Sequence, residues 1–163
     1  MALCLPVLVA LLVGIVSGGT SYSRKISLDT AARDGARYGA TLPVASPYST
    51  LAGTNQWLSA VADVVEKSAL NDLKTGTAGR SICVAYVYPG GTSTSTTDYT
   101  KTLVRTDSAD TYSSNPCIAS DGFSNATRRI QVVVQRSSTL EAVFFSSNLT
   151  LTGQGVTKFE ATS

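Results

Sequence analysis

The architecture of this chain is set by Leu3-Cys-Leu-Pro-Val-Leu-Val-Ala-Leu-Leu-Val-Gly-Ile-Val16, a run that is almost continuously apolar. No charged residue occurs between Met1 and Ser23. As a helix with a rise of ~1.5 Å per residue, this uncharged segment is about 35 Å long, enough to cross a hydrocarbon core of ~30 Å. We therefore expect a membrane anchor or the core helix of an assembly.

Two other interpretations of the run stay open. A secretory signal peptide has a similar apolar length, but no Lys or Arg precedes this run, and Val16-Ser17-Gly18 is a poor cleavage site. A buried core helix of a soluble protein would need packing partners on every side.

The charges around the run give conflicting indications of its orientation. Arg24 and Lys25 follow it, which by charge alone would place the remaining chain in the cytoplasm. The polar remainder, with two distant cysteines, is instead typical of an extracytoplasmic domain. We expect that a basic leader has been removed or lies upstream of Met1.

The helical period continues to about residue 41, where Leu42-Pro43 ends it. Glycine within a helix costs about 0.8–1 kcal/mol relative to alanine, so glycines on one face predict close packing that compensates. This predicted helix–helix packing face consists of Ala31, Ala32, Gly35, Ala36 and Gly39. A neighbouring stripe predicts ion pairs within the helix or between subunits, Asp29 with Arg33 and Asp34 with Arg37; a solvated face is the alternative.

The apolar run and the block Ala31-Ala-Arg-Asp-Gly-Ala-Arg-Tyr-Gly-Ala40 together resemble the N-terminal region of TadE-like pseudopilins. The resemblance extends without a gap from Ala2 to Ala40, and the segment from Leu149 to Glu160 is similar too. The family's glutamate before its Phe-Ala-Leu block is absent, and Ser17 replaces the second acidic position. The resemblance implies a pilin-like subunit that polymerises through its N-terminal helix.

The chain downstream of that helix predicts a small head over residues 42–163. A helix is expected from Gly53 to Gly76, with Trp57 in the core. Thr139 to Phe145 is expected to form one or two helical turns. A turn is expected at 89–91, and strands at Ile82–Tyr88, Tyr99–Arg105, Arg129–Arg136 and Asn148–Glu160. The fold class is α+β, a long N-terminal hydrophobic helix (1–41) packed on a small antiparallel sheet.

Cysteine spacing allows one disulfide in this head. Cys83 and Cys117 can close a loop worth about 3.5–4 kcal/mol in the chain-entropy model. Two buried free thiols are the alternative. Cys4, within the apolar run, is expected to be an inert small hydrophobe.

Composition argues against most chemistry. The chain has no histidine, which excludes Ser-His-Asp and Cys-His nucleophile pairs, and three cysteines cannot fill a four-ligand zinc site. The loop aspartates do not match a calcium-binding loop. A net charge of +2, without a basic cluster, does not indicate nucleic-acid binding. We expect no enzyme, no cofactor, no metal and no nucleic-acid partner.

The sequence thus predicts a structural pilin or pseudopilin subunit of a type IV-like (Tad-type) filament. Its partners would be identical subunits and possibly other pilins, with the inner membrane holding it before assembly and the cell surface carrying the filament afterwards. The alternative is a monomeric membrane-anchored or secreted binding module that uses its Ser/Thr-rich loops, 89–97 and 106–124. The expected anchor residues are Leu3, Leu5, Pro6, Val7, Leu8, Val9, Leu11, Leu12, Val13, Ile15 and Val16.

Overall fold

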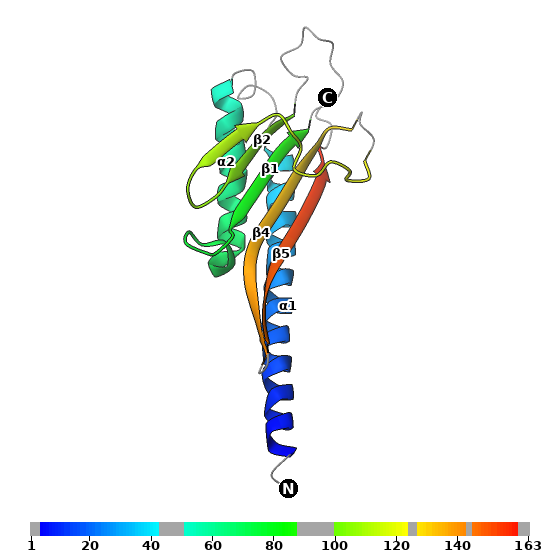
Figure 1. The fold of residues 1–163 in the computed structure, drawn as a ribbon. Coiled ribbons are helices and arrows are strands. Elements are labelled where there is room, and N and C mark those ends of the chain that lie inside the picture. Colours follow the sequence, from blue (N-terminus) through cyan, green and yellow to red (C-terminus); the bar gives the residue numbers. More distant parts are fainter. Residues whose placement is uncertain (1–3, 43–50, 88–99, 124–126, 143–144, 160–163) are drawn as a thin grey trace.

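A long helix carries a small head at its C-terminal end (Figure 1). The computed structural model describes residues 4–42, 51–87, 100–123, 127–142 and 145–159. Helix α1 (Cys4–Thr41) runs the length of the molecule, and its N-terminal half extends beyond the head. The chain therefore has the predicted α+β, pilin-like arrangement, in which a long apolar helix packs on an antiparallel sheet.

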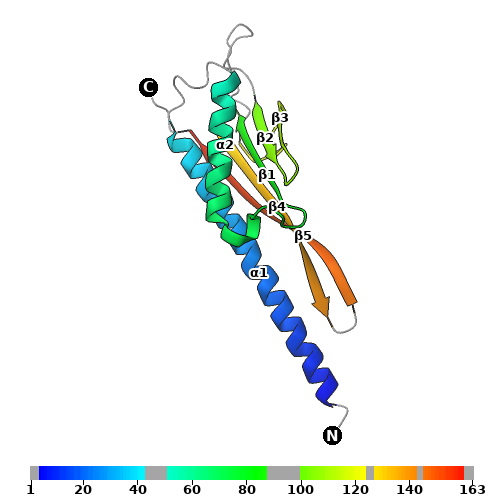
Figure 2. The same ribbon diagram turned by 90° about the vertical axis from the view of Figure 1, so that its left-hand side faces the viewer.

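The sheet has five antiparallel strands in the order β3-β2-β1-β4-β5. Both helices cover one face of it, α1 over β4 and β5 and α2 over β1 and β2 (Figure 2). The head elements are α2 (Leu51–Ser68), the 3-10 helix η2 (Leu70–Leu73), β1 (Ser81–Val87), β2 (Lys101–Arg105), β3 (Asp110–Ser113), β4 (Arg129–Ala142) and β5 (Phe145–Lys158).

Three sequence predictions need correction. The segment from Thr139 to Phe145 is not helical, because its residues pair with β5 as far as Ala142 opposite Phe145. The loop predicted at 106–124 contains β3, which pairs with β2. The second helix ends at Ser68 rather than Gly76 and continues as η2. The turn expected at 89–91 lies outside the described residues.

The core lies between the helices and the sheet. Alternate strand residues point into it, including Ile82 and Val84 of β1 and Val132 of β4, all fully buried. Trp57 of α2 is buried, as predicted, with its ring 5.6 Å from the ring of Tyr86. This core fixes the C-terminal half of α1 on the head, whereas the described residues leave the large apolar side chains of the other half exposed.

Candidate assembly surface

The protruding half of α1 is an apolar surface that the described part of the chain leaves largely exposed. Its eight large apolar side chains are each 40–69% exposed. These eight are Val7, Leu8, Val9, Leu11, Leu12, Val13, Ile15 and Val16, which define the protruding face. By length and composition, the helix from Val7 to Thr41 is able to cross a membrane. Of the other predicted anchor residues, Leu3 lies outside the described residues, and Leu5 and Pro6 lie in the first turns of α1.

The small-residue face is covered by the chain's own head. Ala31, Ala32 and Ala36 have no exposed surface. A Cβ placed on Gly35 would overlap Val65 of α2, and one on Gly39 would lie 2.9 Å from Ile130 Cδ1 of β4. The helix that lies against these glycines is α2 of the same chain. Within the described chain, the head therefore already fills this face.

Two glycines of β5 seat α1 on the sheet. A Cβ on Gly153 would lie 2.5 Å from the carbonyl oxygen of Leu28, and one on Gly155 would overlap the backbone of Ala32. The α1 backbone therefore rests directly on the strand at both positions. Sequence reasoning missed this role, although the alternation Gly-Gln-Gly within a strand signals close backbone approach.

Polar contacts secure the helix where it leaves the head. Lys25 Nζ donates to Thr152 O at 2.8 Å and to Asp29 Oδ2 at 2.9 Å, and Asp29 Oδ1 accepts from the Gln154 amide at 3.3 Å. The carboxylate of Asp29 therefore pairs with Lys25 and with the backbone of β5, rather than with Arg33 as the spacing predicted. Arg33, Asp34 and Arg37 form no salt bridge within the described chain, and their pairing between subunits stays a prediction.

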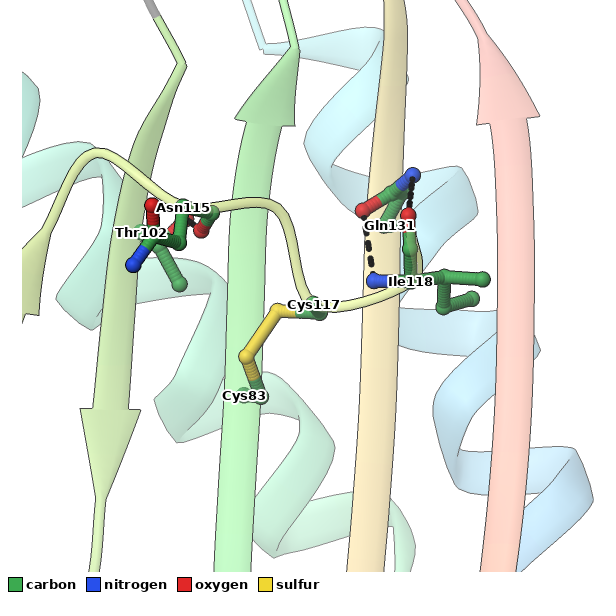
Figure 3. Close-up of a disulfide and its surroundings, with 6 residues drawn as sticks. All are labelled: Cys83, Thr102, Asn115, Cys117, Ile118 and Gln131. Carbon is green, nitrogen blue, oxygen red and sulfur yellow. Dashed lines mark hydrogen bonds between the residues drawn. A yellow bond between two sulfur atoms is a disulfide. The ribbon is translucent and has the colours of Figure 1, made fainter. Parts of the chain in front are cut away.

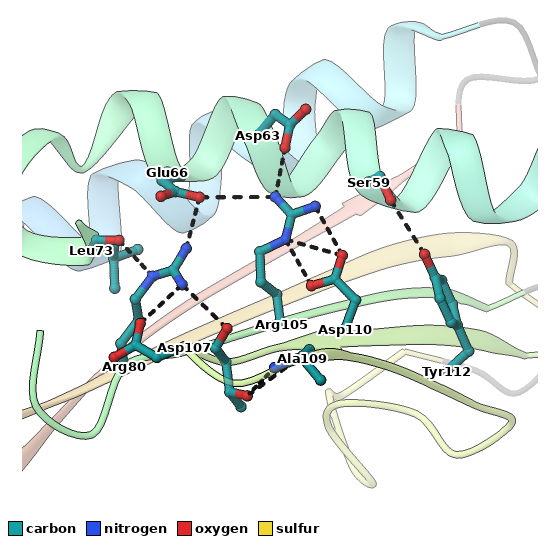
Figure 4. A network of polar contacts seen from close by, with 11 residues as sticks. Ser59, Asp63, Glu66, Leu73, Arg80, Arg105, Asp107, Ala109, Asp110 and Tyr112 are labelled. Carbon is teal, nitrogen blue, oxygen red and sulfur yellow. Dashed lines mark hydrogen bonds and ion pairs between the residues drawn. The ribbon is translucent and has the colours of Figure 1, made fainter. Parts of the chain in front are cut away.

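A network of charges fastens α2 to β1, β2 and β3 (Figure 4). The buried guanidinium of Arg80 pairs with Glu66 at 2.7 Å and donates to Leu73 O at 2.6 Å. Arg105 pairs with Asp63 at 2.5 Å and with Asp110 at 3.0 Å. Hydrogen bonding to Asp110 is the largest contribution that raises the pKa of Arg105, so it stays charged. These contacts explain why α2 packs firmly on the sheet.

The other face of the sheet is crossed by the segment 115–123, which we call the strap (Figure 3). The predicted Cys83–Cys117 disulfide is present, with the two Cα atoms 5.9 Å apart. Gln131, fully buried, accepts from the Ile118 amide and donates to Ile118 O, both at 3.0 Å. Thr102 Oγ1 donates to Asn115 O at 2.5 Å. The strap is thus fixed to three neighbouring strands.

Asp121 holds the far end of the strap through a buried ion pair with Arg129. Burial alone would raise the pKa of this carboxyl group. Hydrogen bonds from Gln131, Arg129 and the Phe123 amide, with the charge of Arg129, outweigh burial and lower that pKa. Asp121 is therefore a structural anion that stays ionised well into the acidic range.

The described residues contain no group of three or more His, Cys, Asp or Glu that could hold a metal ion. One half of α1 is packed on the polar head, and the other half exposes large apolar side chains. The exposed apolar half is the surface suited to association.

Residues 1–37 match the family model described as TadE-like protein. The resemblance to the TadE-like family is shown by that match. No similar chain was found among curated proteins or solved structures.

Proposed function

We propose that this chain is a structural pilin or pseudopilin subunit, held in the membrane by α1 and then assembled through the same helix into an extracellular filament. The supporting observation is the protruding face, whose eight large apolar side chains are exposed on a helix whose other half is built into the head. Removing such a side chain from water is worth about 1.5–3 kcal/mol. Lipid or neighbouring subunits must therefore cover this face.

The head supports the same proposal. A disulfide, a strap and two arginine-centred ion networks stabilise it, and these features suit a domain displayed outside the cell. Transfer of α1 from lipid to a filament gains little hydrophobic energy, because lipid tails are themselves apolar. Side-chain packing between helices must then contribute to assembly, together with contacts between heads.

A charge within the protruding face tests the proposal. Ile15→Asp should abolish filaments on the cells that make this protein, because an aspartate at the centre of a lipid-covered helix costs about 2.5–3.5 kcal/mol. Leu70→Asp is the matched control. Leu70 is the more exposed of the two, at 76%, and its φ of 49° suits aspartate better than leucine.

Negative-stain microscopy with antibody labelling measures filaments, and membrane fractionation measures insertion. We expect filaments from the wild type and Leu70→Asp, and none from Ile15→Asp. Wild-type protein that is monodisperse after detergent extraction, with no labelled filament, would overturn the proposal in favour of a membrane-anchored binding module. Normal filaments from Ile15→Asp would contradict the role of the protruding face.

A further inference from the structure

One groove in the molecule is not explained by assembly. It lies between α1 and the distal part of the β4–β5 hairpin, which extends beyond the head beside the helix (Figures 1 and 2). Its volume is about 500 Å³ and it is open to solvent. Its lining residues are Leu12, Val13, Val16, Ser17, Thr20 and Arg24 of α1 and Thr139 of β4.

The groove changes from apolar to polar along its length. Leu12, Val16, Thr20 and Arg24 recur every four residues and so lie on one stripe of the helix. The apolar end points towards the N-terminus, where the protruding face meets lipid in the proposed function. The polar end, with Ser17, Thr20 and Arg24, lies where α1 enters the head.

The guanidinium of Arg24 is available to a ligand. Its one contact within the described chain is a hydrogen bond from Nη1 to Ser138 Oγ, at 3.4 Å. It forms no salt bridge there. Most N–H donors of this half-buried guanidinium therefore have no acceptor within the described chain. A phosphate group matches the geometry of a guanidinium.

We propose that this groove binds a membrane phospholipid, with its phosphate on Arg24 and an acyl chain along Leu12, Val13 and Val16. The order of the lining residues matches the order of groups in a lipid whose tails point into the bilayer. The inference rests on the membrane stage of the proposed function and does not depend on polymerisation.

Native mass spectrometry of the detergent-solubilised full chain tests the proposal, with phosphatidylglycerol as the probe and diacylglycerol as its phosphate-free counterpart. We expect one phosphatidylglycerol per chain. Arg24→Gln should weaken its retention about fivefold, the effect typical of one basic side chain at an anionic lipid surface. Thr20→Trp should displace the lipid by filling the groove, since Thr20 is exposed and lies on the stripe of α1 that lines it.

Arg33→Gln is the matched control, because Arg33 is an exposed arginine of the same helix and does not line the groove. Equal retention of diacylglycerol and phosphatidylglycerol, or equal lipid retention by Arg24→Gln and Arg33→Gln, would overturn the proposal. So would a dimer whose formation is blocked by Thr20→Trp, since a second helix would then occupy the groove. Specific lipid binding without filaments on cells would instead overturn the proposed function alone.

Discussion

The two halves of α1 differ in side-chain size and in what covers them. The embedded half presents alanine and glycine to α2, β4 and β5 and is buried by the same chain. The protruding half presents leucine, valine and isoleucine, and the described chain leaves them exposed. Small residues allow a fixed backbone to come close, whereas large apolar ones give a broad surface to a partner outside the chain. Side-chain size along one helix thus marks where intramolecular packing stops.

The largest expected effect comes from placing a leucine at the β5 position on which the embedded half rests, compared with a leucine on the protruding half. Gly155→Leu would force Cβ into the backbone of Ala32, and neither element can yield without unseating α1. We expect a loss of more than about 3 kcal/mol in the free energy of unfolding of the head. Gly14→Leu should leave the head intact, since a Cβ there meets no atom of another element in the described chain within 4 Å.

Near-ultraviolet circular dichroism and thermal unfolding of the detergent-solubilised chain measure this difference. Equal unfolding temperatures for Gly155→Leu and Gly14→Leu would show that β5 does not seat the helix as described.

A smaller substitution, glycine to alanine, should change the free energy of unfolding in opposite directions in the two halves of α1. Gly35→Ala places a methyl group against Val65, and we expect it to destabilise the head by about 1–3 kcal/mol. Gly18→Ala meets nothing within 4 Å and should favour the helix by up to about 1 kcal/mol. Chemical denaturation of both variants beside the wild type provides the comparison. Stabilisation by Gly35→Ala would mean that α1 and α2 are not packed closely.

The smallest expected effect is acid loosening of the strap, far from either half of α1. The pKa of Asp121 is lower in the folded head than the value of about 3.9 for an unperturbed aspartate. Its stabilisation is therefore complete above that value and is lost as the pH falls through the folded pKa. As the pH falls through the folded pKa of Asp121, hydrogen exchange at the Ile118 and Phe123 amides should increase relative to an unstructured reference peptide.

Asp121→Asn removes the titrating group and should abolish this acid-dependent increase. An unchanged acid response in that variant would assign the loosening to another group. In both proteins, exchange in the embedded half of α1 should stay slow over the same pH range.

The sequence was sufficient for the features that depend on local pattern. The apolar run, the end of the helix near Thr41 and the strands β1 and β2 follow from composition and periodicity. The family resemblance of the N-terminal region was visible in its residues and is matched over residues 1–37. The disulfide followed from cysteine spacing, with free thiols as the open alternative.

The features that the sequence did not predict depend on contacts between distant segments. The sequence does not show whether Gly35 and Gly39 contact another subunit or the same chain. In the structure, α2 and β4 of the same chain lie against them. The polar strand β3 lacks an apolar alternation and forms because β2 offers a free edge. The hairpin extends to Ala142 through pairing with β5, which outweighs the helical preference of Leu140-Glu-Ala142.

The seat of Leu28 on Gly153 joins the first element of the chain to the last. A ribosome therefore releases α1 long before it makes the strand on which the helix rests. Until β5 is made, the backbone at Leu28 and Ala32 lacks the two glycines on which it packs, and contacts this far apart in sequence form slowly. Early insertion of the protruding half into the bilayer would hold the nascent chain in place, so that the head closes over a helix already anchored.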